Sequence, residues 1–237
     1  DTAKASAVPG VILVLTGKDV PGVNTLGMLI PDQPAIAEGI VKCTADPIAV
    51  VIAETDRTAR AAAALITVEY TILPAHFSPE TAVAEGAYRI HLSGNICHQA
   101  KLQRGDVEAA FRSAAVVVEQ SYTTQAADPG FLEPESGMAW KDEQGRIVVE
   151  MGTQSAFDDR RQIASALGLD ETEVVIRQVP MGGAFGAKED ISLQFILALA
   201  AWKTGRRVRI TLTREDSFLI HPKRHPAHMS YKTAMDA

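Results

Sequence analysis

The sequence predicts a mixed α/β protein of the α+β class, in which a small α/β domain precedes a larger α+β domain. Short β-branched runs alternate with stretches of high helix propensity in both halves of the chain. A region of weak periodicity that contains prolines and glycines separates the two halves. The length of 237 residues is sufficient for two domains of ordinary size.

Two buried strands should open the first domain, which we expect over residues 1–85. Residues 11–15 and 48–53 are short apolar runs rich in β-branched side chains, a composition typical of strands that are covered on both faces. Gly17 follows the first run closely and indicates a turn.

A helix and a third strand should complete this domain. The alanine-rich residues 57–66 favour a helix, and Thr55 or Asp56 can provide its N-cap. Alternation of apolar and polar side chains over residues 68–72 then predicts a strand, which Pro74 stops. Strand–helix–strand order on short connections indicates a small α/β unit.

A weakly patterned stretch follows, and we interpret residues 86–103 as a linker and residues 104–237 as the second domain. Asp106 can cap a helix that extends through Phe111, and Gly168 stands where a C-terminal helix cap is expected. Further helices are expected over residues 156–167 and 191–203. Strands are expected over residues 116–123, 137–140, 147–151, 174–179 and 208–213. The second domain should therefore carry helices packed on a sheet.

Composition narrows the class of protein. Hydrophobic residues make up 46% of the chain and charged residues 22%, as in soluble globular proteins. A formal net charge of -6 argues against a nucleic-acid partner, because phosphate binding needs a basic surface. The longest apolar stretch, residues 191–202, is shorter than the ~20 residues that cross a bilayer, so no membrane association is expected.

The two cysteines, Cys43 and Cys97, are too far apart in sequence to form a metal-binding or redox motif. The spacing is compatible with a single disulfide between them. Two isolated thiols are more typical of a reducing compartment, and we therefore expect a cytoplasmic protein. An iron–sulfur cluster normally needs more cysteines than this chain contains.

Three glycines gather between a predicted strand and a predicted helix, at residues 182–186. Glycine lets the backbone approach a ligand closely, and amides near a helix start can bind anionic oxygens. A tight turn without any ligand is the alternative. A dinucleotide fingerprint does not fit, because Ala184 or Phe185 stands where its second glycine is required. A Walker loop does not fit either, because it needs Ser or Thr after the lysine, and here Glu189 follows Lys188.

The segment from Met181 to Glu189 resembles the G-G-x-F-G-x-K-E loop of the xanthine dehydrogenase and aldehyde oxidase family. Other family motifs occur in the same order at residues 8–11, 19–22, 60–62, 68–70, 73–75, 105–107, 132–134, 153–154, 203–206 and 224–226. The resemblance covers essentially the whole chain. It implies a hammerhead-like α/β domain followed by the first part of a molybdopterin-binding α+β domain.

The resemblance implies that the full-length protein is an oxidoreductase, a molybdenum hydroxylase that uses oxygen derived from water. Its cofactor would be a molybdenum–pterin group, with iron–sulfur clusters and possibly FAD on other domains or subunits. The residues implied in cofactor binding are Gln154, Gly183, Ala184, Phe185 and Gly186. Among these, Gln154 and Phe185 would lie closest to the metal and its oxygen ligands.

Glu189 is the residue from which the resemblance implies a substrate. Lys188-Glu189 after the loop resembles family members that act on purines, so the expected substrate is a purine such as xanthine or hypoxanthine. A carboxyl group can hydrogen-bond a purine ring. A structural carboxylate at a helix start is the other interpretation of Glu189. An aldehyde or another N-heterocycle as substrate, and a stand-alone anion-binding module, remain the alternative functions.

Several positions depart from the family pattern. Ala184 and Ala187 stand where glycines are common, residues 44–47 lack the usual glycine, and Pro129 stands where many relatives have histidine. The general-base glutamate of the family belongs to a later segment, so no catalytic residue is expected here. The chain opens without methionine and closes in a strand-like pattern at residues 229–233. We therefore expect a fragment that binds little cofactor by itself and turns nothing over.

Two further patterns suggest functions that we do not assign. The tripeptide at residues 104–106 spells an integrin-binding motif, but a turn and a helix cap explain it. His221, His225 and His228 are spaced by prolines that bar a regular helix, so we expect solvated histidines or histidines on a strand rather than a metal site.

Overall fold

The computed structural model describes all residues from 1 to 237. By their internal contacts the residues form two compact units. The first unit contains residues 1–68 and 128–224, and the second contains residues 69–127 and 225–237. Each unit is therefore built from two separate stretches of the chain. The domain boundaries expected from the sequence stay a prediction.

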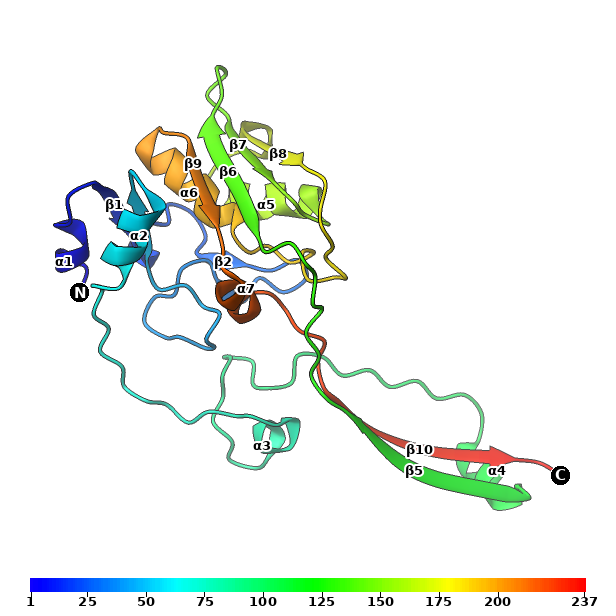
Figure 1. The fold of residues 1–237 in the computed structure, drawn as a ribbon. Coiled ribbons are helices and arrows are strands. Elements are labelled where there is room, and N and C mark those ends of the chain that lie inside the picture. Colours follow the sequence, from blue (N-terminus) through cyan, green and yellow to red (C-terminus); the bar gives the residue numbers. More distant parts are fainter. The chain divides into compact units, whose positions relative to one another are not determined.

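A four-stranded sheet is the centre of the first unit (Figure 1). Its strand order is β8-β7-β6-β9. The strands are β6 (Ser136–Lys141), β7 (Ile147–Met151), β8 (Val174–Gln178) and β9 (Val208–Thr211). β6 pairs antiparallel with both β7 and β9, whereas β7 and β8 run parallel. The predicted mixed α/β class is thus confirmed.

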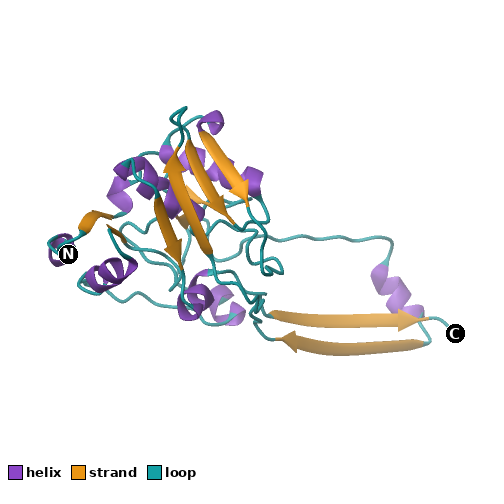
Figure 2. Cartoon of the chain, turned by 45° about the horizontal axis from the view of Figure 1, so that its top comes forward, coloured by secondary structure: helices purple, strands orange, loops and turns teal.

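Two helices, α5 (Ala156–Leu167) and α6 (Gln194–Thr204), cover one face of this sheet (Figure 2). Alternate β7 residues, namely Ile147, Val149 and Met151, join them in one hydrophobic core. α6 is buried around most of its surface, which explains why its sequence is apolar without a polar face. Both helices end at a glycine in the left-handed region, as predicted for α5.

A small α/β arrangement forms the N-terminal part of the same unit. After the short α1 (Ala3–Ser6), β1 (Val11–Leu15) pairs antiparallel with β4 (Val50–Ala53). α2 (Asp56–Ala63) follows, and Thr55 is its N-cap, since the Thr58 N–H donates to Thr55 Oγ1 at 3.1 Å. The two predicted strands and the predicted helix are confirmed. The additional strands β2 (Thr25–Leu26) and β3 (Gln33–Pro34) form a minimal pair of their own.

The predicted strand over residues 68–72 is wrong, because these residues form no strand. Tyr70 and Ile72, which the alternating pattern would place on a covered face, are 63% and 93% exposed. A strand needs a hydrogen-bonding neighbour as well as an alternating pattern, and no segment of this chain pairs with residues 68–72.

The second unit contains a long antiparallel ribbon of two strands, β5 (Val116–Thr124) and β10 (Ala227–Met235), visible in Figure 2. It also contains α3 (Pro79–Val83), which Ser78 caps, and α4 (Val107–Ser113). Asp106 caps α4 as predicted, because the Ala109 N–H donates to Asp106 Oδ1 at 2.9 Å. The strand-like residues 229–233 lie within β10, so that prediction is confirmed.

Three short helices, α1, α3 and α7, were not predicted from the sequence, and α7 is the one that lies close to the candidate site. α7 (Arg214–Ile220) begins directly after Thr213, whose side chain accepts from the Asp216 N–H at 3.1 Å while the Thr213 N–H donates to Asp216. This reciprocal capping box ends β9 at Thr211, two residues earlier than the sequence indicated. None of the helices, α7 included, combines the length and apolar character that a bilayer crossing requires.

Asp159 is a fully buried carboxyl group at the contact between α5 and α6. Its Oδ2 accepts from Gln194 Nε2 at 3.3 Å, while its Oδ1 has no hydrogen-bond partner. Burial raises the pKa of Asp159 to about 6, and hydrogen bonds from Thr153 and Gln194 oppose this only in part. Ionised Asp159 is therefore unfavourable for the folded state.

Replacing Asp159 with asparagine should remove a pH dependence of stability. Because the folded-state pKa is raised, the folded chain keeps the Asp159 proton to a higher pH than the unfolded chain does. The stability that the neutral carboxyl group provides is therefore complete only below about pH 4, and it is lost as the pH rises through about 6. Across this interval the unfolding free energy of the unmodified chain should fall by roughly 3 kcal/mol relative to Asp159→Asn. Urea unfolding at several pH values measures the difference, and parallel pH curves for the two proteins would contradict it.

Candidate functional site

The glycine-containing segment lies in a long loop, residues 179–193, between β8 and α6. The predicted helix begins at Gln194 rather than at residue 191, because Gln194 folds back and its Oε1 accepts from the Ser192 N–H at 2.7 Å. Glu189 therefore does not lie in the first turn of a helix. The loop amides do not form a helix N-terminus either, and this expectation from the sequence is wrong.

Gln154 contacts this loop directly. Its Oε1 accepts from the Gly186 N–H at 3.1 Å and from the Lys188 N–H at 3.3 Å, and its own N–H donates to the Lys188 carbonyl at 2.9 Å. Gln154 follows β7, and the loop follows β8. Since β7 and β8 are parallel neighbours, their carboxyl ends lie at the same edge of the sheet. The structure thus brings together the two stretches that the resemblance had implied for one site.

Two hydrogen-bond donors remain available at this place. Gln154 is exposed and its Nε2 donates to no atom of the chain, while the Phe185 N–H also has no partner within residues 1–237. Phe185 is the only non-glycine residue with positive φ, at 53°, and its side chain is 77% exposed. The Gly186 N–H is already bound to Gln154. The arrangement can therefore offer donors to an anionic oxygen from Gln154 and Phe185.

Gly182 and Gly183 are needed because a neighbouring segment approaches them closely. A Cβ atom on Gly182 would lie 2.8 Å from the Cβ of Glu133, and one on Gly183 would lie 3.3 Å from the Cβ of Phe131. Gly183 also has φ at +103°, a conformation that other residues rarely adopt. Residues 131–133 thus lie against the loop with no space for larger side chains.

Glu133 and Lys188 form an ion pair beneath the loop. Glu133 Oε1 lies 3.2 Å from Lys188 Nζ, and Glu133 Oε2 accepts from the Gly182 N–H. The Lys188 side chain is only 2% exposed, and its ammonium group lies 4.8 Å from the centroid of the Phe131 ring. Sequence reasoning recognised Glu133 only as part of a family motif and missed these contacts. A single acidic residue before proline gives no signal of a partner 55 positions away.

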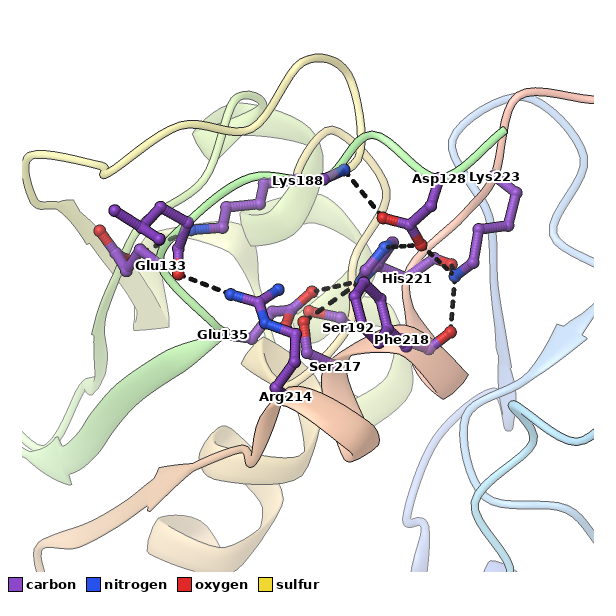
Figure 3. Close-up of polar contacts among 12 residues, drawn as sticks. Asp128, Glu133, Glu135, Lys188, Ser192, Arg214, Ser217, Phe218, His221 and Lys223 are labelled. Carbon is purple, nitrogen blue, oxygen red and sulfur yellow. Dashed lines mark hydrogen bonds and ion pairs between the residues drawn. The ribbon is translucent and has the colours of Figure 1, made fainter. Parts of the chain in front are cut away.

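A second polar cluster has His221 at its centre (Figure 3). His221 Nε2 lies 2.9 Å from Asp128 Oδ2, and its Nδ1 lies 3.5 Å from Glu135 Oε1. The imidazole ring is 4.8 Å from the ring of Phe131. Burial raises the pKa of Asp128, but hydrogen bonds from the Gly130 N–H and from His221 outweigh it and hold that pKa below its usual value.

His221 corrects the expectation of a solvated or strand histidine. Its side chain is fully buried, because the unpredicted helix α7 ends at Ile220 and directs the next residue inward. His228 lies on β10 as expected, where its Nδ1 is 3.0 Å from Glu80 Oε1. Within residues 1–237 no three His, Cys, Asp or Glu side chains are grouped so that they could hold a metal ion.

The remaining residues implied by the resemblance also lie in the loop. Ala184 and Ala187 are buried, so their methyl groups point into the protein. Glu189 is exposed and makes no polar contact with the rest of the chain. Its carboxylate is therefore available to a ligand, and no structural role competes for it.

Exchanging Gln154 for leucine should destabilise the chain by about 1–2 kcal/mol, because two backbone N–H groups lose their acceptor. Gln154→Glu keeps an oxygen in the same place and should cost less than ~0.5 kcal/mol. Urea unfolding tests both, with Gln144→Leu in the exposed β6–β7 turn as the control. Equal stabilities of the Gln154→Leu variant and the control would argue against the hydrogen bonds.

Two family descriptions match the sequence. Residues 90–237 match the molybdopterin cofactor-binding domain. Residues 1–74 match the a/b hammerhead domain of aldehyde oxidase and xanthine dehydrogenase. Together the two matches account for most of the chain.

Curated relatives extend over nearly the whole chain. A probable xanthine dehydrogenase subunit of Bacillus subtilis is 41% identical over 235 residues, which are 99% of this chain and 32% of the relative. The nicotinate dehydrogenase large molybdopterin subunit of Eubacterium barkeri is 39% identical over 98% of this chain and 55% of the relative. The chain thus spans about a third to a half of the length of these relatives.

The structure is also similar to solved structures. The aldehyde oxidoreductase of Desulfovibrio gigas superposes with a TM-score of 0.94 at 31% identity, over 100% of this chain and 27% of that one. Because the first family description covers more than half of the residues, the chain belongs to the molybdopterin cofactor-binding domains of the xanthine dehydrogenase and aldehyde oxidase family.

Proposed function

We propose that this chain supplies one wall of the molybdenum–pterin pocket of a molybdenum hydroxylase. The observation that carries the proposal is the contact between Gln154 and the loop, which leaves Gln154 Nε2 and the Phe185 N–H without partners in the chain. Both are donors, and donors fit the negatively charged oxygen ligands that such a group carries. The family match supports the same cofactor.

The residues around this point fit a bulky anionic group. We infer that Gln154 and Phe185 lie beside the metal and that Gly183, Ala184 and Gly186 contribute the loop backbone around the cofactor. The group itself supplies the two-electron redox centre through which oxygen from water enters a substrate. The task of the chain is to hold donors in fixed positions, and the hydrogen bonds to Gly186 and Lys188 keep Gln154 from rotating.

For the substrate we propose a purine such as xanthine or hypoxanthine. Glu189 lies one residue after Lys188, is exposed and has no competing partner, so its carboxylate can accept a hydrogen bond from a purine N–H. The exposed ring of Phe185, in the same loop, offers an apolar surface. Similarity to a probable xanthine dehydrogenase subunit supports this choice.

Another N-heterocycle or an aldehyde is the alternative substrate. The relative described as a nicotinate dehydrogenase subunit is almost as similar to this chain as the probable xanthine dehydrogenase subunit, at 39% against 41% identity. The structural neighbour from Desulfovibrio gigas is an aldehyde oxidoreductase. A comparison of xanthine, hypoxanthine, nicotinate and an aldehyde with the full-length protein distinguishes these substrates.

The proposal extends to the rest of the protein. We place iron–sulfur clusters and a flavin on further domains or subunits, because the chain offers no group of ligands for a cluster. We also propose a cytoplasmic location, which the two free cysteines Cys43 and Cys97 favour. The general base is expected outside this chain, as the family resemblance implies.

In the full-length protein Glu189→Gln should lower kcat/KM for xanthine roughly tenfold, because the amide oxygen still accepts the hydrogen bond but lacks the charge that strengthens it. Oxidation of an aldehyde that has no ring N–H should change less than about threefold. Asp190→Asn is the matched control, since Asp190 is the exposed neighbour of Glu189. Steady-state kinetics measures these ratios. An equal loss for xanthine and the aldehyde would show that Glu189 does not recognise the purine.

The 237-residue chain alone should hold far less than one molybdenum atom per molecule, since much of the pterin pocket is expected on later segments. Metal analysis after purification from cells that make the cofactor measures the ratio. The full-length protein, prepared in the same way, is the positive control. A stoichiometric signal from the short chain would contradict the expected division of the pocket. No molybdenum in the full-length protein would instead favour a stand-alone anion-binding module.

A further inference from the structure

We propose that Glu133 is a positioning residue for the molybdenum-binding loop, and that its ion pair with Lys188 determines where Gln154 and Phe185 present their donors. The inference rests on the proposed function, because it concerns the geometry of the same site. It gives a role to Glu133, a residue outside the loop to which the family resemblance assigned none.

Glu133 ties the two ends of the loop segment to a single side chain. One carboxylate oxygen accepts from the Gly182 N–H, and the other lies 3.2 Å from Lys188 Nζ. Gly182 and Lys188 enclose the segment that contains Phe185. Gly182 approaches Glu133 so closely that a side chain at position 182 would collide with it.

Lys188 transmits this restraint to Gln154. Its side chain is held by Glu133, while its backbone N–H and carbonyl are both hydrogen-bonded to Gln154. A shift of the Lys188 side chain would therefore move the peptide groups that orient the Gln154 amide. Glu133 thus acts on the site through Lys188 rather than by touching a ligand.

The Lys188 ammonium group is buried, so water cannot take the place of Glu133 as its partner. The Lys188 side chain is 2% exposed, and Glu133 is its ion-pair partner within 4 Å. The nearby carboxylates Asp128 and Glu135 face His221 instead. Without Glu133 a buried ammonium group would remain without a counterion, so Lys188 would have to leave its place beside Phe131.

The segment that carries Glu133 is itself fixed. The ring of Phe131 is fully buried against His221, and the guanidinium group of Arg214 donates to the Leu132 carbonyl. Arg214 also lies 5.7 Å from the centroid of the Phe131 ring. A side chain that positions a site must stand on a rigid support, which is provided here by Arg214 in α7 and by His221 directly after that helix.

The test uses the full-length protein with Glu133→Gln, Lys188→Met and the double variant. Glu143→Gln, an exposed glutamate in the β6–β7 turn, is the control. Hydrogen–deuterium exchange on cofactor-free protein follows the amides of residues 182–188. The electron paramagnetic resonance spectrum of Mo(V) in the reduced, loaded protein reports the geometry around the metal.

We expect each single variant to exchange the loop amides about tenfold faster or more and to change the Mo(V) spectrum, while the control matches the unmodified protein. The double variant leaves no unpaired buried charge, so its exchange should increase by less than the product of the two single effects. Unchanged exchange, or multiplicative effects in the double variant, would overturn the pairing.

The two proposals fail in different ways. If the unmodified full-length protein contains no molybdenum, the proposed function is wrong, but the exchange measurement still decides whether Glu133 holds the loop. If exchange rises and the Mo(V) spectrum of both single variants is unchanged, Glu133 holds the loop without positioning the metal site, and the inference is overturned while the function stands.

Discussion

The parallel pairing of β7 and β8 is the constraint on which the site depends. β6 is antiparallel to both of its neighbours, so β7, β8 and β9 end at the same edge of the sheet, but only β7 and β8 are adjacent strands there. Gln154 and the glycine loop are the continuations of these two strands. The backbone therefore brings them together before any side chain contributes, and the hydrogen bonds to Gly186 and Lys188 then fix the detail.

Much of this arrangement could be predicted where local chemistry and periodicity agreed. The limits of α5 and β7 follow from a helical apolar face ended by Gly168 and from a hairpin turn around Gly145. The meeting of Gln154 with the loop was reached through family resemblance, since 32 residues separate the two and no local pattern connects them. Propensity and caps thus determined the elements, but not the contacts between them.

What could not be predicted depends on partners distant in sequence. Residues 68–72 have the pattern of a strand but no neighbour to pair with. The burial of His221 depends on α7, whose capping box ends in Asp216 rather than in the glutamate or glutamine that usually signals one. The task of Glu133 depends on the place of Lys188 in the folded chain. The missing partner of residues 68–72 and the contact of Glu133 are properties of the tertiary structure and leave no trace in a short window of sequence, whereas Thr213 and Asp216 are a local signal for α7 that the sequence interpretation did not use.

The close packing of residues 131–133 against Gly182 and Gly183 has a consequence for protein engineering. The glycine loop cannot be transferred to another protein by itself, because its conformation depends on packing against Phe131 and Glu133. A graft of residues 181–189 onto another α/β scaffold would lack this template and would relax into other conformations. Successful transplantation would need both segments, together with the parallel strand pair that presents them.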